Sequence, residues 1–310
     1  MKLDFKAIKN QGIIQKIGMS LLFCLFVFVF LFQLWSYDWS SIQHVRIENF
    51  NFLLAAIIFV GANWFFEWKK WIDGMKSIHN FSDEVLQKGF YAGMLSGFLT
   101  PSALGNFIGR MTAVNKELKP KVVANTLMGN GAQFLISLFF GTLSLFLLND
   151  LPEFANFLWI KVVVALIVFL GLVIYFLIGH VAILKNFSSK YLPSFVSISL
   201  RLRARFLIWS AIRYLVFSFQ FYLVLKAFQP ELTFEVWFWV WQLYLWTTLS
   251  PSLFLGKLFI RETMAIFVLS YAGVDLPIAL LSCLLIWLIN NALPSFYAYF
   301  KWKAHVLVKA

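Results

Sequence analysis

Two arginines, Arg110 and Arg261, lie within strongly apolar stretches, and each follows a glycine at the same distance. Five residues separate the glycine from the arginine in both copies, which pair Gly105 with Arg110 and Gly256 with Arg261. The breaks that precede these pairs are Thr100-Pro101-Ser102 and Ser250-Pro251-Ser252. A guanidinium is planar, permanently charged and able to bind phosphate through two parallel hydrogen bonds. A helix that restarts after a break also offers free N–H groups, so the repeated pattern predicts an anion-binding site.

The 310-residue chain around these arginines has the composition of a membrane protein. It is 61% hydrophobic and 13% charged, whereas soluble domains are about 25% charged. Its aromatic content of 19% is the opposite of a disordered composition. The net charge of +12 comes from Lys and Arg in short clusters beside apolar runs, which favours membrane topology over nucleic-acid binding. We therefore expect an all-α integral membrane protein without a nucleic-acid partner.

Six apolar stretches have about the 20 residues that a helix needs to cross a membrane. They cover residues 17–35, 50–68, 122–148, 155–179, 206–228 and 278–300. The Lys and Arg on their flanks place both termini in the cytoplasm. The same rule places Lys69, Lys70 and Lys76 in a cytoplasmic loop after the second span. We expect one polytopic transmembrane domain over residues 1–310, a helical bundle in the cytoplasmic (inner) membrane.

Two further segments, near residues 89–114 and 236–272, contain the proline breaks and have arms too short to cross the membrane twice. Basic residues flank the first segment and acidic residues flank the second. The first is therefore expected to enter from the cytoplasm and the second from outside. The result is two oppositely oriented re-entrant helical hairpins, which form an inverted repeat. Interrupted segments in matching places of two inverted halves mark the substrate site of many transporters.

The arginines have a structural interpretation as well as a functional one. An arginine at membrane depth costs about 2.5–3.5 kcal/mol by insertion scales, so two at a repeated spacing favour a function. In the structural alternative, Arg110 and Arg261 extend to their interfaces, or Arg261 pairs with Glu262. Arg213, inside the fifth span, supplies a third positive group. Glu67 is interpreted as a paired charge at the cytoplasmic edge of the second span.

At these positions the chain resembles the flippase-like transmembrane domain of lysylphosphatidylglycerol synthases and of their stand-alone relatives. The residues that carry the resemblance are Pro101, Gly105, Arg110, Pro251, Gly256, Arg261, Glu262, Gly273, Val274 and Ala279. The resemblance spans about residues 10–300. It implies a protein that binds or translocates an anionic phospholipid or lipid-linked headgroup. Because the chain ends shortly after its sixth span, we expect a member without the aminoacyl-transfer domain.

Two departures from the family's motifs leave the identity of the lipid open. Asn106 stands where the family has an acidic residue, and Lys257 stands where its second motif has a glycine. The expected headgroup-binding side chains are Asn106, Arg110, Arg213, Lys257, Arg261 and Glu262. The expected partners are therefore membrane lipids, the anionic ones above all.

The sequence predicts neither an enzyme nor a cofactor or metal site. The histidines lie in loops or at chain ends without metal-ligand spacing, and the chain has no Walker-type phosphate loop. Two other functions stay open. One is a non-transporting scaffold that docks a lipid-modifying enzyme on the basic loop 180–205. The other, a polyprenyl-phosphate glycosyltransferase, is disfavoured because the acidic residues of the expected outer loops are scattered and never adjacent.

Overall fold

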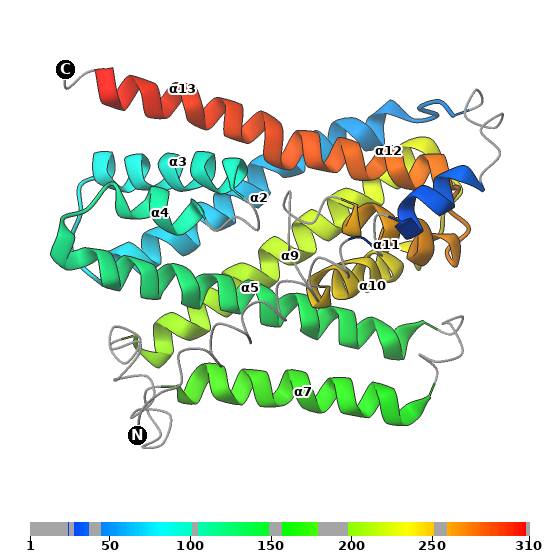
Figure 1. Cartoon of the computed structure of the whole chain (residues 1–310), viewed down its shortest axis with the longest axis horizontal. Helices are drawn as coiled ribbons and strands as arrows, with labels where there is room; N and C mark the ends of the chain where they lie inside the picture. The colour runs from blue at the N-terminus through cyan, green and yellow to red at the C-terminus, as the bar shows by residue number, and fades with distance from the viewer. Residues whose placement is uncertain are drawn as a thin grey trace.

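The computed structural model describes residue 24 and residues 28–36, 45–100, 105–148, 157–178, 198–250 and 259–307. All regular elements in these ranges are helices (Figure 1). The stretches long and apolar enough to cross a membrane are Phe50–Lys76, Lys116–Leu147, Leu158–Leu177, Leu200–Phe228 and Leu276–Lys303. The protein is therefore all-helical and multi-spanning in the part that the structure describes. The first expected span, 17–35, lies mostly outside that part.

The helices form a central group with shorter or peripheral helices around it (Figure 1). Their bounds are α2 (Phe50–Lys76), α3 (Asp83–Leu99), α4 (Gly105–Met111), η3 (Lys116–Leu118), α5 (Lys119–Leu147), α7 (Leu158–Leu177), α9 (Leu200–Phe228), α10 (Val236–Leu249), α11 (Ile260–Ser270), α12 (Leu276–Trp287), η6 (Leu288–Ala292) and α13 (Leu293–Leu307). α2, α5 and α9 pack together at the centre, and α9 crosses the bundle diagonally. α13 packs over α3, and α7 lies along α5.

α2 is longer than the span expected at 50–68. It begins where Asn49 accepts a hydrogen bond from the Asn51 N–H, which caps the helix. It then continues without a break to Lys76. Lys70, expected in a cytoplasmic loop, therefore lies on α2 and is buried. The expectation is wrong here because an apolar run marks the most hydrophobic part of a helix and not its end.

α9 begins within the expected loop 180–205, because the Ser199 side chain caps it by accepting a hydrogen bond from a first-turn N–H. Arg203 is fully buried and donates to the carbonyls of Tyr175 and Phe176 at the end of α7. A cation there satisfies free carbonyls and the helix dipole, so this arginine fixes the end of α7 against α9. Most of the loop lies outside the described residues, and the docking of a partner enzyme stays a prediction.

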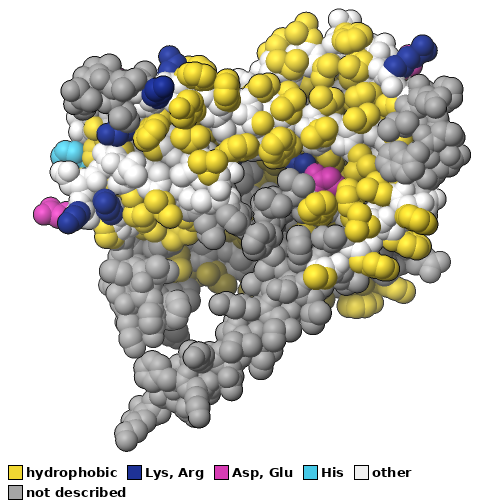
Figure 2. Space-filling model, turned by 45° about the horizontal axis from the view of Figure 1, so that its top comes forward, with side chains coloured by type: hydrophobic (Ala, Val, Ile, Leu, Met, Phe, Trp, Pro, Cys, Tyr) yellow, Lys and Arg dark blue, Asp and Glu magenta, His cyan; other side chains and the backbone are white. Residues whose placement is uncertain are grey.

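α7 packs on α5 and exposes most of its surface. Val168 and Tyr175 are the only buried residues among its 20, and the helix is apolar all round. A helix with this pattern is stable at the surface of a bundle only where lipid surrounds it. Figure 2 shows hydrophobic side chains over much of one face of the molecule, with most of its charged side chains near the margins.

Two pairs of short helices, α3 with α4 and α10 with α11, occupy the places of the expected hairpins. α3 has 17 residues and α10 has 14, so both are shorter than a typical spanning helix. The connections lie outside the described residues and include Pro101, Pro251, Gly256 and Lys257. The re-entrant orientation, the six crossings and the inverted repeat therefore stay predictions.

Glycines let α4 approach α3 closely. A Cβ on Gly105 would overlap the backbone of Ser96 on α3. One on Gly109 would overlap the backbone of Ala92, so both positions require the absence of a side chain. The Ser96 hydroxyl donates to the Gly105 carbonyl at 2.6 Å, and the Gly105 N–H donates to the Thr100 hydroxyl at 2.6 Å. These contacts fix the position of α4, a helix too short to be stable alone.

The last spanning stretch contains a π-helical turn, η6, between α12 and α13. Pro294, at the start of α13, has no N–H to donate to the Asn290 carbonyl. The Trp64 indole N–H on α2 donates to that carbonyl at 3.2 Å. Turns of this kind often mark functional sites, and here the turn places the Asn290 side chain against α2 and α9.

Candidate functional site

Three polar side chains on α2 point into the bundle from one face of the helix. Asn63, Glu67 and Lys70 follow each other at the intervals of four and three residues that align side chains along a helix. All three are buried. A carboxylate and an ammonium inside a membrane protein need partners, and the neighbouring helices α4 and α9 supply them.

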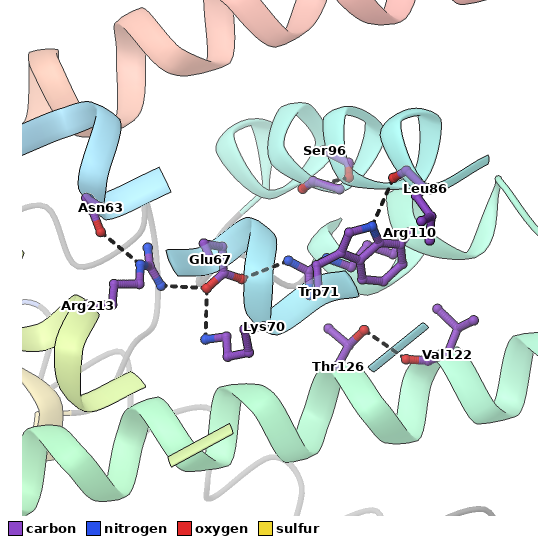
Figure 3. Close-up of polar contacts among 11 residues, drawn as sticks. Asn63, Glu67, Lys70, Trp71, Leu86, Ser96, Arg110, Val122, Thr126 and Arg213 are labelled. Atoms are coloured by element: carbon purple, nitrogen blue, oxygen red, sulfur yellow. Dashed lines mark hydrogen bonds and ion pairs between the residues drawn. The ribbon is translucent and has the colours of Figure 1, made fainter. Parts of the chain in front are cut away.

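Four charged side chains, which we call the Glu67 cluster, meet at one carboxylate: Glu67, Lys70, Arg110 and Arg213 (Figure 3). Arg110 Nη2 donates to Glu67 Oε1 at 2.8 Å. Arg213 Nη1 donates to Glu67 Oε2 at 2.9 Å, and Lys70 Nζ lies 2.8 Å from the same oxygen. One anion therefore faces three cations from three helices. With all four groups ionised, the cluster carries two excess positive charges.

Arg110 is positioned by α3 and by an aromatic ring. Gly93 on α3 makes room for it, since a Cβ there would lie 2.6 Å from Arg110 Cγ. The guanidinium carbon lies 4.8 Å from the centre of the Trp71 ring, which is a cation–π contact. The Trp71 indole N–H donates to the Leu86 carbonyl at 2.9 Å. The guanidinium is thus held between α3 and α2 and directed at the Glu67 carboxylate.

Arg213 is positioned by a chain of amides. Its Nε donates to Asn63 Oδ1 at 2.9 Å. Asn63 donates to Asn290 at 2.9 Å, and Asn290 donates to Gln220 at 2.7 Å. Gln220 then donates to the Ala56 carbonyl at 2.8 Å. Because an arginine can only donate, it sets the direction of every hydrogen bond in this chain, which links α9, α2 and η6.

The Glu67 cluster lines a cavity of about 500 Å³. The neutral polar residues of its lining are Asn106, Asn130, Gln133, Ser137, Thr248, Asn291 and Ser295. Some buried polar atoms of this lining have no hydrogen-bond partner among the described residues: both amide atoms of Gln133, Asn106 Oδ1 and Arg110 Nε. Buried polar atoms in proteins are normally paired with protein or water. The walls of the cavity therefore keep hydrogen-bonding capacity for a polar ligand.

An apolar groove of about 780 Å³ adjoins the cavity. It lies between α2, α3 and the last span, where Ile57, Leu293 and other apolar side chains line it. Trp64, Phe90 and Met94 line both the groove and the cavity. A polar cavity beside an apolar groove has the shape and chemistry to hold an amphiphile, with its charged group in one and its hydrocarbon chain in the other.

The expected headgroup-binding residues that meet in this cavity are Asn106, Arg110 and Arg213. Arg261 and Glu262 do not line it; they form an ion pair with each other on α11. Arg261 thus makes the ion pair with Glu262 that the structural interpretation expects. Arg110 instead pairs with a carboxylate on another helix. Lys257 lies outside the described residues.

Glu67 and Lys70 are central to the cavity but are not among the expected site residues. Glu67 is paired, as expected, but its partners include arginines from two other helices. One signal for this role is the placement of Asn63, Glu67 and Lys70 on one face of a mainly apolar and aromatic segment. Another is the series of glycines at four-residue intervals in 89–97, which is typical of helices in close contact.

The cavity offers electrostatic binding of an anion. Its charged donors are an ammonium and two guanidiniums, and hydrogen bonds from such groups to phosphate or carboxylate are about twice as strong as neutral ones. Among the described residues, no group of three or more His, Cys, Asp or Glu side chains could hold a metal ion. The described part of the site thus supplies fixed positive charge and neutral polar groups.

Comparison with known proteins gives one assignment. No curated protein and no solved structure matches the chain. The family model described as "Lysylphosphatidylglycerol synthase TM region" matches residues 16–297, which is nearly the whole chain. The matched range contains the whole Glu67 cluster and both pairs of short helices. The chain therefore belongs to the lysylphosphatidylglycerol synthase transmembrane-region family.

Proposed function

We propose that the protein binds the anionic headgroup of a phospholipid or lipid-linked molecule in the cavity and translocates it across the cytoplasmic (inner) membrane. In this proposal both termini are cytoplasmic and the two pairs of short helices re-enter the membrane from opposite faces. The observation that carries it is the positively charged Glu67 cluster, in a polar cavity that adjoins an apolar groove. Membership in a family named after a phospholipid synthase adds support for a lipid.

The electrostatic problem in moving a lipid is the headgroup. An isolated charge in hydrocarbon costs tens of kcal/mol by Born solvation, so a path for the headgroup must replace its water. Arg110 and Arg213 supply charge-assisted hydrogen bonds from α4 and α9. Glu67 holds both guanidiniums at one point, and the phosphate of an incoming headgroup competes with its carboxylate for their donors.

The hydrocarbon chain needs no such help, because it stays in an apolar environment throughout. The groove between α2, α3 and α13 gives it a place beside the headgroup cavity. Burial of each CH₂ is worth about 0.8 kcal/mol, so contact with Ile57 and Leu293 stabilises a bound lipid without fixing its chain length. The headgroup then provides selectivity, and the groove provides affinity.

Purified protein in liposomes with a fluorescent anionic lipid tests this proposal. We expect wild-type protein to move the lipid between leaflets, and Arg110→Lys to impair the movement. Arg201→Lys is the matched control, since Arg201 is exposed in the first turn of α9 and does not line the cavity. Binding without movement would indicate a scaffold, and absence of both would overturn the proposal.

A further inference from the structure

Within the proposed function, we infer that the cavity selects a lipid with a terminal phosphate, which is a dianion, over lipids with singly charged phosphodiester headgroups. This inference rests on the proposed function and specifies its substrate class. The balance of charge in the Glu67 cluster carries it. Three cations, Lys70, Arg110 and Arg213, face the single carboxylate of Glu67.

Burial makes this excess of positive charge unfavourable unless an anion joins it. The side chains of Glu67, Lys70 and Arg110 are at most 6% exposed, and that of Arg213 is 22% exposed. The described lining contains no acidic residue besides Glu67. Charges taken out of water are stable only with nearby compensation. A dianion brings the cluster to neutrality, whereas a monoanion leaves one positive charge uncompensated.

The number of oxygen atoms gives a second, geometric reason. The two oxygens of Glu67 serve three cations, so Lys70 and Arg213 share Oε2 while Arg110 has Oε1. Each guanidinium has five N–H donors, and Arg110 Nε has no partner among the described residues. A phosphate monoester has three terminal oxygens, one for each cation. A phosphodiester has only two such oxygens, fewer than the three cations.

The uncharged part of the lining fits the same ligand. Gln133 on α5 has a buried amide nitrogen and oxygen without partners among the described residues. Its nitrogen can donate to a phosphate oxygen, and its oxygen can accept from a bridging water. The single ester link of a terminal phosphate leaves one direction for the hydrocarbon chain, past Trp64 and Phe90 into the apolar groove.

The excess positive charge could also be reduced without a dianion, and the experiment below distinguishes the two cases. Loss of a proton from Lys70 would lower the excess to one positive charge, and a monoanion would then suffice. In that case phosphomonoester and phosphodiester headgroups would bind alike. Ligand selectivity therefore distinguishes the two arrangements.

The test measures binding of phosphatidic acid and phosphatidylglycerol with matched acyl chains to the full chain in phosphatidylcholine nanodiscs. At about pH 8 the first lipid is a dianion and the second a monoanion. We expect phosphatidic acid to bind on the order of tenfold more tightly. Equal affinities would overturn this inference and leave the proposed function standing. If neither lipid bound, both this inference and the proposed function would be overturned.

Soluble phosphates separate a lipid ligand from a free anion. Glycerol phosphate and inorganic phosphate carry the same charge as phosphatidic acid at about pH 8 but have no chain for the groove. We expect both to bind much more weakly. If either one matched phosphatidic acid, the site would belong to a soluble phosphate, and the inference of a lipid dianion would be wrong.

A pH series tests the same point on wild-type protein. The second ionisation of a phosphate ester is near pH 6, so phosphatidic acid is mostly a monoanion at about pH 5 and should lose its advantage. Phosphatidylglycerol keeps its charge and is the internal reference for changes in the protein. The charged groups that line the headgroup cavity are Glu67 and Lys70 of α2, Arg110 of α4 and Arg213 of α9. Lys301 of α13 lines the groove that takes the hydrocarbon chain and does not line the cavity. An advantage that persisted at about pH 5 would contradict the inference.

Variants of Lys70 complete the test. Lys70→Gln lowers the positive excess to one, so the two lipids should bind within about threefold of each other. Lys70→Arg keeps the charge and should keep the preference. Lys76→Gln, at the exposed end of the same helix, is the control and should behave as wild type. Full preference in a folded Lys70→Gln protein would overturn the inference.

Discussion

The two arginine regions share a sequence pattern and differ in what surrounds the arginine. Arg110 on α4 reaches across to Glu67 on α2, where cations from α2 and α9 join it. Arg261 on α11 pairs with the next residue, Glu262, and does not line the cavity. A repeated motif therefore predicts a repeated charge but not the partner of that charge.

The way each short helix meets its neighbour accounts for the difference. α4 lies close against α3 because glycines form the contact, including Gly105 and Gly109. α11 contains no glycine. It starts after Phe259, which has a positive φ of 67°, a conformation that is strained for a bulky residue. Arg110 is thus carried to the interior on a closely packed helix, while Arg261 finds its partner locally.

The largest difference between the two regions should be the loss of stability when the acidic partner of each arginine is neutralised. Glu67→Gln removes the single negative charge among three cations, and we expect a loss of about 3–5 kcal/mol in unfolding free energy, or failure to fold. Glu262→Gln affects one cation in a partly exposed pair, so a loss of about 1–2 kcal/mol is expected. Denaturant unfolding in detergent measures both. Equal losses would mean that the Glu67 cluster is no more than a local ion pair.

The second effect separates the arginines by ligand binding. Arg110→Lys keeps the charge but loses the planar fork, and such a contact is worth on the order of 1.5–3 kcal/mol, or roughly ten- to a hundredfold in affinity. Arg261→Lys should be nearly silent, since a lysine can still pair with Glu262. Lipid binding and melting temperature are measured for both variants. If Arg261→Lys strongly reduced lipid binding without a loss of stability, Arg261 would have to be a headgroup-binding residue.

The third effect tests the close approach of α3 and α4. A Cβ on Gly93 would lie 2.6 Å from Arg110 Cγ, so Gly93→Ala should displace the arginine and cost about 1–3 kcal/mol in stability. Gly131→Ala on α5 is the matched control, because its Cβ would meet only Tyr175 Cε2 at 3.9 Å. That change should be neutral or stabilise the helix by up to about 1 kcal/mol. Similar stabilities for the two variants would show that Arg110 does not depend on Gly93.

The five described spanning stretches could be predicted from the sequence because bilayer thickness fixes the length of a span. The stretch expected at 206–228 lies within α9, and the one expected at 278–300 lies within the last spanning stretch. Arg110 and Arg213 could be singled out in the same way, because a charged residue inside an apolar stretch is conspicuous in the sequence.

The partners of these arginines could not be predicted. Glu67 is 43 residues from Arg110 and 146 from Arg213, and no local rule joins positions so far apart. The contact depends on the packing of α3, α4 and α9 around α2. The burial of Lys70 follows from the sequence only if the helix is known to continue past residue 68, because a lysine next to an apolar run has the same local pattern in a loop and on a buried helix face.

The smallest expected effect concerns the ring beneath Arg110. Trp71→Phe keeps an aromatic face for the guanidinium but removes the indole N–H that donates to the Leu86 carbonyl at 2.9 Å. The lost hydrogen bond is worth about 1 kcal/mol, and the weaker cation–π contact adds a few tenths more. Because Glu67 still directs the guanidinium, lipid affinity should fall by less than about threefold.

The matched change near the second region is Tyr271→Phe, which keeps the ring that stacks on Trp239 and removes an exposed hydroxyl. It should alter neither stability nor binding, because removing the hydroxyl of an exposed residue that does not line the cavity breaks none of the contacts that hold Arg110 or the ligand. If Trp71→Phe instead reduced binding as much as Arg110→Lys, the ring rather than the carboxylate would be what positions Arg110. The Glu67 cluster would then be a consequence of the α3–α4 contact and not the element that organises the cavity.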